Sequence, residues 1–339
     1  MKKYNLPKVS FIIPTLNAAS ILPLCLTQIR NQNYPQDKIE IIVADGGSTD
    51  MTLSIARRSN AIIIKNPEIL HEPGKDRASK IATGEILFFT DADNILSGPN
   101  WVQSMVIPYL ENNKKIQGFM PQTLPAPNSN SLDRYMGSLS TDPFTWFVYR
   151  YASSPRTYAD HYPILKKTPQ YTIFKFDVMN HPLCGLSQGF GTIAAFKREK
   201  IGHSDDILAA IKLIAERGII AYVPQAGIYH YHVSGISDFL KKYTWKIRNN
   251  FYQRVKGMGL INRQRYLNSG RRIRQILFVP YSLTLIFPII DTGLLFYKYL
   301  DIVVLWHPIA CLLLSLLMIK ETFLFLFGFR KEPGIYGAK

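Results

Sequence analysis

Cysteine is scarce in this chain, and its scarcity excludes two classes of small fold. The 339 residues contain three cysteines, Cys25, Cys184 and Cys311, which lie far apart and form no CxxC pair. A disulfide framework and a cysteine-rich zinc site both need paired cysteines, so we expect a reducing compartment. Hydrophobic residues make up 47% of the chain, which is enough for one sizeable domain with an extension or for two domains.

Acidic residues and a leader-like apolar run are also lacking. The chain has 24 Asp and Glu against 40 Lys and Arg, a net charge of +16, which predicts anionic partners such as phosphorylated ligands or an acidic membrane surface. No nucleic-acid-binding motif appears, so we expect no nucleic-acid partner. The first apolar run, residues 9–13, ends at Pro14 and is too short for a secretory signal, which places the body of the chain in the cytosol.

Up to about residue 235, apolar strand-like runs alternate with helical patterns. Strands are predicted at 9–14, 39–45, 61–65 and 85–91, and helices at 18–32, 48–59 and 76–83. This order predicts βαβ crossovers and an α/β fold with a mostly parallel, Rossmann-like sheet flanked by helices. Ligands bind beyond the carboxyl ends of such strands. Because Pro14, Thr15, Asp45 and Asp91 all stand at those ends, we expect one site there.

Asp91 and Asp93 follow an apolar strand one residue apart. Two carboxylates so close repel each other unless a cation lies near both. Mg²⁺ and Mn²⁺ prefer carboxylate oxygens together with ligand phosphates, so the pair predicts a metal that bridges to a diphosphate. Taken alone, however, so short a motif is more often a solvated pair of acids at a strand end.

Glycine and basic side chains stand near the same edge. Asp45 could accept hydrogen bonds from a nucleobase, and Gly46 lets the backbone turn closely around a ligand. An ordinary turn with Ser48 as a helix cap is the alternative interpretation. Lys75 and Arg77 could pair with phosphates, or they could be unremarkable exposed charges at a helix start.

Four motifs together resemble the inverting family 2 glycosyltransferases with the GT-A fold. They are VSFIIPTLNAA, IIVADGGSTD, ATGEILFFTDAD and YVPQAGIYHYH, in this order across residues 8–232. The resemblance implies a nucleotide-sugar donor, either a UDP- or a GDP-sugar, and a Mn²⁺ or Mg²⁺ ion. It also implies a set of residues that bind the donor: Pro14, Thr15, Asn17, Asp45, Gly46, Lys75, Arg77 and Asp91.

The same resemblance implies a role for each acid and for one histidine. Asp45 would contact the base, Asp93 would bind the metal, and Asp91 would assist at the metal or lie near the ribose. His230, rather than His232, matches the histidine that often completes the metal site. A sheet-edge imidazole in an aromatic cluster is the alternative interpretation of His230.

The expected catalytic base departs from the family's pattern of Glu-Asp at the start of a helix that ends in glycine. The helix that ends at Gly218 opens with Asp205 and Asp206, about one residue further away than usual. We favour Asp206, and Asp205 second, as the carboxylate that deprotonates the acceptor hydroxyl. Two acids that cap a helix are the alternative. Lys75 and the following aspartate stand where many members have Arg-Asn, so phosphate contacts there remain open.

The C-terminal third changes in character. Residues 241–274 contain eleven basic side chains and no acidic one, and the apolar segments 276–297 and 302–319 follow. Twenty-two helical residues span about 33 Å, close to the thickness of a hydrocarbon core. The positive-inside rule places both ends of this hairpin in the cytosol. Pro280, Pro288 and Asp291 also suit a re-entrant hairpin, and a buried helical pair in a soluble dimer is the alternative.

These observations predict a GT-A catalytic domain at 1–235, a basic amphipathic interfacial segment at 236–275, and a membrane hairpin with a short cytosolic tail at 276–339. The expected protein is a metal-dependent glycosyltransferase of the hexosyltransferase type in polysaccharide or cell envelope biosynthesis. It would act at the cytoplasmic face of the cell membrane, on an anionic lipid surface, and transfer sugar to a lipid-linked or membrane-proximal glycan acceptor. The alternative is a non-catalytic nucleotide-sugar-binding scaffold subunit of an assembly complex. The sequence predicts neither the sugar nor the oligomeric state.

Overall fold

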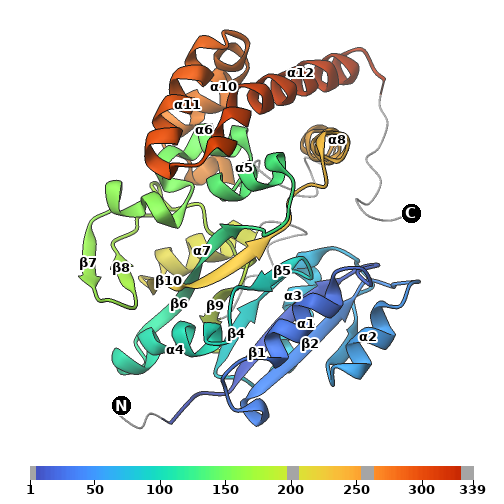
Figure 1. Cartoon of the computed structure of the whole chain (residues 1–339), viewed down its shortest axis with the longest axis vertical. Coiled ribbons are helices and arrows are strands. Elements are labelled where there is room, and N and C mark those ends of the chain that lie inside the picture. The colour runs from blue at the N-terminus through green and yellow to red at the C-terminus, as the bar shows by residue number, and fades with distance from the viewer. Residues whose placement is uncertain (1–4, 197–205, 253–262, 330–339) are drawn as a thin grey trace. The chain divides into compact units, whose positions relative to one another are not determined.

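The chain forms two compact units in a computed structural model that describes residues 5–196, 206–252 and 263–329 (Figure 1). The first, here called the sheet unit, comprises Met1–Gln122 and Tyr158–Tyr229. The second, the helical unit, comprises Thr123–Thr157 and His230–Ala338. Residues 123–157, which have weak helical and strand periodicity, therefore belong with the C-terminal helices.

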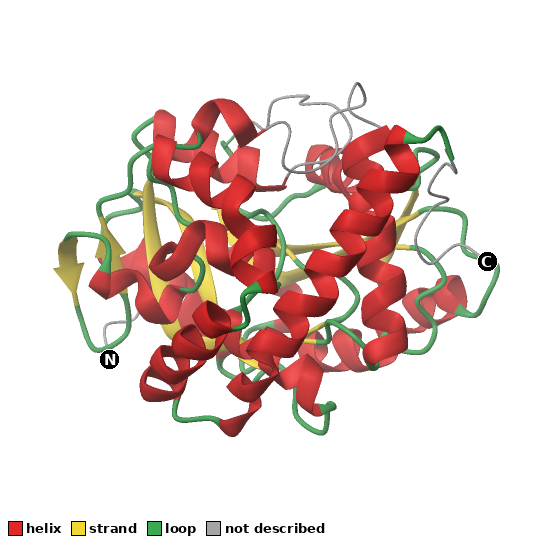
Figure 2. Cartoon of the chain, turned by 90° about the horizontal axis from the view of Figure 1, so that it is seen from above, coloured by secondary structure: helices red, strands yellow, loops and turns green. Residues whose placement is uncertain are grey.

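The strands form one ten-stranded sheet, drawn in yellow in Figure 2. They are β1 (Val9–Thr15), β2 (Ile39–Asp45), β3 (Ile62–Lys65), β4 (Ile86–Phe89), β5 (Asn94–Leu96), β6 (Ile116–Pro125), β7 (Ile164–Lys167), β8 (Thr172–Phe174), β9 (Phe190–Ile193) and β10 (Ile219–His230). The order is β3-β2-β1-β4-β9-β6-β10-β8-β7, and β5 pairs with β10.

The sheet is mixed, whereas the sequence predicted a mostly parallel one. β3, β2, β1 and β4 are parallel, as expected from their intervening helices. β9 is antiparallel to both of its neighbours, and the β7–β8 and β8–β10 pairs are also antiparallel. The antiparallel pairing was missed because β7 and β8, of four and three residues, lie within a stretch that has weak periodicity, and because the sequence of a strand does not indicate its direction.

The parallel half is apolar on both faces, which explains why its strands read as continuous hydrophobic runs. Every residue of β1 is buried. Phe11 of β1 and Phe88 of β4 lie 5.3 Å apart between ring centroids, and Trp101 packs edge-on against Phe88 at 5.0 Å. This aromatic group anchors the strands whose carboxyl ends carry the predicted site.

Among the described residues, the sheet unit contains the helices α1 (Leu22–Arg30), α2 (Thr52–Arg58), α3 (His71–Ile81), α4 (Trp101–Glu111) and α7 (Asp206–Ala215). α1 illustrates how they form. It begins with a proline in its first turn, where the missing N–H costs nothing. Its buried residues Leu22, Cys25, Leu26 and Ile29 recur at helical spacing and make one apolar face.

The helical unit is built from α5 (Ser131–Leu139), α6 (Pro143–Tyr149), α8 (Ile236–Tyr252), α10 (Ser269–Leu283), α11 (Ile286–Tyr299) and α12 (Trp306–Leu326). Short 3₁₀ helices complete the described chain: η1 (Gln36–Lys38), η2 (Arg150–Ala152), η3 (Pro155–Asp160), η5 (Gln264–Tyr266) and η6 (Ile302–Leu305). The six helices share one core, in which Tyr135, Phe147, Phe278 and Leu314 are buried.

α12 packs within this bundle and also has the properties of a membrane helix. Together with η6 it is the one helix of the described residues, Ile302–Leu326, that is long and apolar enough to cross a membrane. Its Glu321 is fully buried and accepts hydrogen bonds from Arg248 of α8 at 2.7 and 3.2 Å. α12 is therefore fixed to α8 by an ion pair as well as by apolar contacts.

The first of the two expected membrane helices is bent. The apolar segment 276–297 divides into α10 and α11, whose axes differ in direction by 103°. Only the two helices together are long and apolar enough to cross a membrane. Leu285 at the break has a positive φ of 56°. Length and composition thus support one membrane helix and one broken pair, a form that the two prolines of this segment made possible.

Candidate functional site

Thr15 and Asp45 lie side by side at the carboxyl edge of the parallel strands. They are the last residues of β1 and β2 and are partners in the strand register. The Thr15 hydroxyl donates to Asp45 Oδ1 at 3.4 Å, and both residues are buried. The Asp45 carboxylate also accepts from the Gly47 N–H and the Ser48 N–H, each at 2.9 Å. Asp45 therefore fixes the turn that follows β2.

Asn17 joins this turn to the loop after β1. Its side-chain oxygen accepts from the Thr49 N–H at 2.9 Å, and its own N–H donates to the Ser48 hydroxyl at 2.9 Å. Asn17 has a φ of 49°, a left-handed conformation that asparagine tolerates better than most residues. The two loops are thus cross-linked into one rigid edge, with Pro14 buried within β1 and Gly46 donating to the Thr15 carbonyl at 2.8 Å.

A buried lysine stands behind Asp91. Lys75 of α3 is 2% exposed, and its Nζ lies 3.0 Å from Glu72 Oε1 and 3.6 Å from Asp91 Oδ1. His71 Nδ1 lies 3.5 Å from the same Asp91 oxygen. A lysine can be buried when carboxylates compensate its charge, so Lys75 and Asp91 stabilise each other's ionised form. The sequence predicted Lys75 as a phosphate contact; the structure adds this contact with Asp91.

The acids of this edge affect their neighbours electrostatically. Burial, reinforced by the charges of Asp93 and Asp91, raises the pKa of the Cys25 thiol above its usual range. The partial desolvation of His71 favours the neutral ring, but the hydrogen bond and charge of Asp91 outweigh it and raise the pKa of His71. The negative charges of Asp91 and Asp93 therefore act on both neighbouring side chains.

Asp91 and Asp93 fit a divalent cation in the kind of donor that they offer. Asp93 Oδ1 accepts from Asn94 Nδ2 at 3.0 Å, and the Asn94 side-chain oxygen accepts from the Asp91 N–H at 3.1 Å. Asn94 thus holds the turn that presents both carboxylates. Within residues 5–196, 206–252 and 263–329, no three His, Cys, Asp or Glu side chains are grouped so that they could hold a metal. A cation here would need phosphate or water ligands as well, as Mg²⁺ commonly does.

Asp206 begins α7 and is held by the loop before β9. The Ser187 hydroxyl donates to Asp206 Oδ2 at 2.7 Å, and the Leu186 N–H donates to the Asp206 carbonyl at 3.1 Å. Gly185 leaves room for this carboxylate, because a Cβ at that position would lie 2.4 Å from Asp206 Oδ2. The side chain of Asp206 is half-buried. Its orientation is therefore set by three consecutive residues, 185–187.

The same loop is attached to the end of β4. The Gly189 N–H donates to the Phe89 carbonyl at 2.8 Å, and Phe89 is two residues before Asp91. Gly189 has a φ of 75°, and a side chain there would collide with Ile228 of β10. Asp91 lies two residues after the end of β4, and Asp206 is linked to the same strand end through residues 187–189.

The remaining predicted residues have other contacts or lie outside the described chain. Arg77 is exposed on α3 and pairs with Glu68 at 3.0 Å. His230 is the last residue of β10 and belongs to the helical unit, where its ring lies 4.1 Å from that of His232. Asp205 lies outside the described residues. The roles assigned to these three residues stay predictions.

Sequence reasoning missed Gly185, Ser187 and His71. Ser187 and Gly185 precede β9 in a segment without readable periodicity, and the sole signal was the dense glycine pattern of CGLSQGFG. His71 precedes Lys75 by one helical turn, so both can face Asp91. That spacing would have signalled His71 if the helix start had been predicted at residue 71 rather than at 76.

Residues 10–201, more than half of the chain, match the family model described as "Glycosyl transferase family 2". Two curated relatives are similar over shorter stretches. A poly(ribitol-phosphate) beta-glucosyltransferase of Bacillus spizizenii is 34% identical over 96 residues, 26% of this chain and 15% of that protein. The glycosyltransferase AglE of Haloferax volcanii is 35% identical over 95 residues, 26% of this chain and 31% of that protein. The matches thus cover less than a third of either relative.

Among solved structures, the chain is similar to the mannosyltransferase PcManGT from Pyrobaculum calidifontis in complex with GDP-Man and Mn²⁺. The two share 16% identity with a TM-score of 0.49, over 97% of this chain and 89% of that one.

Proposed function

Because the chain belongs to glycosyl transferase family 2, we propose that its sheet unit transfers a sugar from a nucleotide diphosphate-sugar to an acceptor hydroxyl with inversion at the anomeric carbon. The observation that carries this proposal is the anchoring of Asp206 and Asp91 to one strand end. The Ser187 hydroxyl donates to Asp206 at 2.7 Å, and the Gly189 N–H donates to Phe89 at 2.8 Å. The proposed base, Asp206, and the carboxylate of Asp91 are thereby both positioned by the end of β4.

Each side chain has a proposed role in this reaction. Asp206 accepts the proton of the acceptor hydroxyl as its oxygen attacks the anomeric carbon, and the bond from that carbon to the diphosphate breaks. Ser187 keeps the Asp206 carboxylate in one orientation by donating to Oδ2. At the other strands, Thr15 and Asp45 hold the turn with Gly46 that would receive the nucleoside.

Asp91 and Asp93 are the proposed carboxylate ligands of a divalent cation, with His230 as a further predicted ligand. When bound, Mn²⁺ or Mg²⁺ would supply positive charge to the departing diphosphate. Lys75 contributes to the same edge from within the protein. Its ammonium, 3.6 Å from Asp91 Oδ1, fixes that carboxylate and stabilises its charged form.

We also propose that the helical unit associates with a membrane. Side chains on α10, α11 and α12 are both apolar and exposed, including Ile276 at 78%, Leu294 at 57% and Phe323 at 54%. Contiguous exposed apolar residues on this scale are typical of membrane or protein interaction surfaces. The acceptor would then be lipid-linked or membrane-proximal, and synthesis of an envelope glycan or glycolipid is the proposed setting.

Turnover of nucleotide sugars by the full chain in detergent tests the proposed activity. We expect release of a nucleoside diphosphate from one UDP- or GDP-sugar, and its loss when EDTA removes divalent cations. Asp206→Asn should lower the rate by about 10²- to 10⁴-fold, because general base catalysis contributes on that order. Asp160→Asn, which removes an aspartate of the sheet unit outside this edge, is the matched control.

Binding measurements separate the catalytic proposal from a scaffold role. If the wild-type chain binds a nucleotide sugar but turns none over with any acceptor fraction, the non-catalytic scaffold is correct. If Asp206→Asn keeps the full rate, Asp206 is not the base. Donor binding that is unchanged by EDTA would remove the metal role of Asp91 and Asp93.

A further inference from the structure

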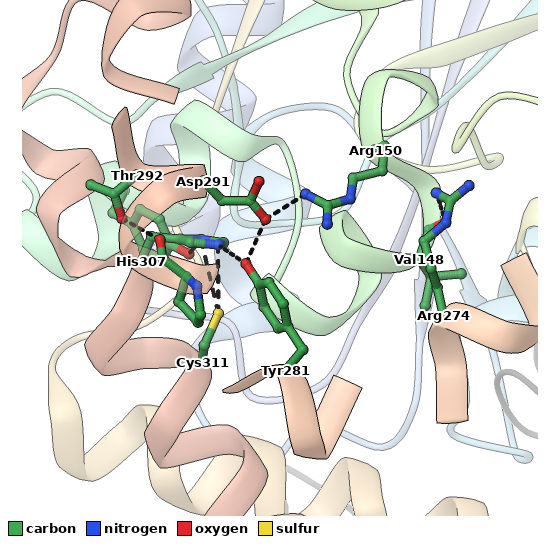
Figure 3. A network of polar contacts seen from close by, with 10 residues as sticks. Val148, Arg150, Arg274, Tyr281, Asp291, Thr292, His307 and Cys311 are labelled. Atoms are coloured by element: carbon green, nitrogen blue, oxygen red, sulfur yellow. Dashed lines mark hydrogen bonds and ion pairs between the residues drawn. The ribbon is translucent and has the colours of Figure 1, made fainter. Parts of the chain in front are cut away.

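Three arginines of the helical unit converge on the end of α6. Arg274 Nη1 donates to the Val148 carbonyl at 2.8 Å, and the Arg271 guanidinium lies 4.4 Å from the centre of the Tyr149 ring. Arg150 is the residue that follows α6. Figure 3 shows Arg150 and Arg274 on the same side of Asp291 and Tyr281. The cluster therefore joins α6 to the first two turns of α10.

Arg150 is held rigidly by its surroundings. Its Nη1 lies 2.5 Å from Asp291 Oδ2, and the Tyr281 hydroxyl donates to that same oxygen at 2.6 Å (Figure 3). Its guanidinium also stacks at 4.7 Å on the ring of Trp146. The backbone of Arg150 has φ 52° and ψ −126°, a conformation that a non-glycine residue rarely adopts. Such strain persists where packing enforces it and is concentrated at functional sites.

The start of α10 adds positive potential to the cluster. Asn268 caps this 15-residue helix by accepting from the Arg271 N–H at 3.0 Å, and its first turn has no acidic residue. Cations are disfavoured at a helix N-terminus, where the dipole and free N–H groups favour an anion. Arg274 contacts a carbonyl group, and Arg150 and Arg271 are both close enough to repel it electrostatically. An anion would relieve this repulsion.

Exposed apolar side chains lie within one turn of Arg274 on the same helix. Ile273 is 55% exposed, Ile276 is 78% exposed and Leu277 is 46% exposed. The Arg150 side chain is itself 30% exposed, so the cluster can be reached from solvent. The charge and the apolar surface together suit a ligand that has an anionic head and a hydrocarbon tail.

We propose that Arg150, Arg271 and Arg274 form a binding site for a phosphate group attached to a hydrocarbon chain. Guanidinium groups bind phosphate oxygens through two parallel N–H bonds, which a lysine cannot reproduce. Arg274 and Arg150 would contact the phosphate from its accessible side, and the buried Arg271 would support the cluster from below. The tail would lie along the apolar side chains of α10.

This inference deepens the proposed function, on which it rests for the identity of its ligand, because it gives the acceptor class as a glycan carried on a lipid phosphate, in which a sugar hydroxyl is the group that Asp206 would deprotonate. The binding site itself can be tested without any sugar. The probes are farnesyl phosphate, farnesol and inorganic phosphate, titrated calorimetrically into the full chain in detergent. We expect farnesyl phosphate to bind at least about tenfold more tightly than either of the other two compounds.

Variants of α10 test the residues. Arg274→Gln should weaken farnesyl phosphate binding by about tenfold or more, since it removes charge-assisted hydrogen bonds. Arg272→Gln is the matched control, because Arg272 is exposed and donates instead to the Leu267 carbonyl at 2.9 Å. It should change the affinity by less than about twofold. If Arg274→Gln fails to fold, Arg274→Lys replaces it, and an intermediate loss is expected because the charge remains without the planar fork.

Three results would overturn the site: equal binding of farnesol, equal binding of inorganic phosphate, or equal losses in the Arg274 and Arg272 variants. These results are distinct from a failure of the proposed function. If farnesyl phosphate binds as expected while no nucleotide sugar is ever turned over, the glycosyltransferase activity is wrong and the site stands. If donor turnover is found but farnesyl phosphate does not bind, the activity stands and the site is wrong.

Discussion

Both units contain ion pairs with one deeply buried member, which is a lysine in the sheet unit and an acid in the helical unit. In the sheet unit, Lys75 is buried beside Glu72 and Asp91. In the helical unit, Glu321 is fully buried against Arg248, and Asp291 is buried against Arg150. In each unit the buried ion fixes partners of the other sign that lie nearer the surface. The sheet unit thereby presents carboxylates, which suit a cation, and the helical unit presents guanidinium groups, which suit an anion.

The units differ equally in their apolar surfaces. In the sheet unit the aromatic group of Phe11, Phe88 and Trp101 is fully enclosed or nearly so. In the helical unit, α10 to α12 leave many large apolar side chains exposed, Tyr297 at 84% among them. The aromatic core of the sheet unit is therefore closed to solvent, whereas the exposed apolar side chains of α10 to α12 form the surface that we propose to contact a membrane.

The largest effect is expected from removal of the buried lysine. Lys75→Met should lower the free energy of unfolding by about 3–5 kcal/mol, because it leaves two partly buried carboxylates without their cation. Urea denaturation followed by tryptophan fluorescence measures the change. Lys80→Met on the same helix, which breaks an exposed pair with Asp76, is the matched control and should cost under about 1 kcal/mol. Equal losses in the two variants would show that burial of Lys75 confers no special role.

Gly185→Ala should have the next largest effect, on activity rather than on stability. The added Cβ would lie 2.4 Å from Asp206 Oδ2, so the carboxylate must move. A displacement of about 1 Å at a catalytic group can cost about 10²-fold in rate. Steady-state turnover of the nucleotide sugar measures it. Gly98→Ala, where nothing lies within 4 Å of the new Cβ, should leave the rate unchanged. If Gly185→Ala keeps the full rate, the space at residue 185 does not determine the position of the Asp206 carboxylate.

Glu321→Gln tests the corresponding buried ion in the helical unit. The amide keeps the shape of the side chain but leaves the Arg248 charge without its carboxylate, so a loss of about 2 kcal/mol is expected. It is smaller than for Lys75→Met because Arg248 is 23% exposed and water can solvate it. Urea denaturation in detergent measures it, with Arg134→Gln as control, since Arg134 forms an exposed pair with Asp301. If Glu321→Gln lowers the free energy of unfolding by more than Lys75→Met does, the buried ion of the helical unit is the more important of the two for stability.

These expectations mark what the sequence could and could not predict. The runs that became β1, β2 and β4 were predictable because burial on both faces makes a strand uniformly apolar, and the acids at their ends follow directly. The burial of Lys75 was not predictable, because it depends on which side of α3 faces the sheet. Arg150 and Asp291 are 141 residues apart, and no local pattern indicates their contact. The break between α10 and α11 was indicated by its prolines, although its angle was not.

Glu40 gives the smallest and most pH-dependent effect, and it shows how the sheet unit holds a charge mainly by hydrogen bonds. Burial alone would favour protonation, but donors from Ser10 and Thr83 and the charge of Lys8 lower the pKa of Glu40 below its ordinary value. The contribution of Glu40 to stability is therefore present above about pH 4.5, the ordinary value for a glutamate. It is lost as the pH falls through the lowered pKa, because the unfolded chain binds the proton first.

Glu40→Gln should consequently be less stable than the wild type near pH 7, and the difference should shrink as the pH falls below about 4.5. Thermal unfolding between pH 7 and pH 3 measures both curves. Glu111→Gln, which removes an exposed glutamate at the end of α4, controls for the loss of one negative charge. A constant gap between Glu40→Gln and the wild type across this range would mean that packing of the side chain, rather than its charge, accounts for the effect. In that case the charge of Glu40 would contribute little to stability, and the paired ammonium of Lys75 would remain the feature that sets the ion pairs of the sheet unit apart from those of the helical unit.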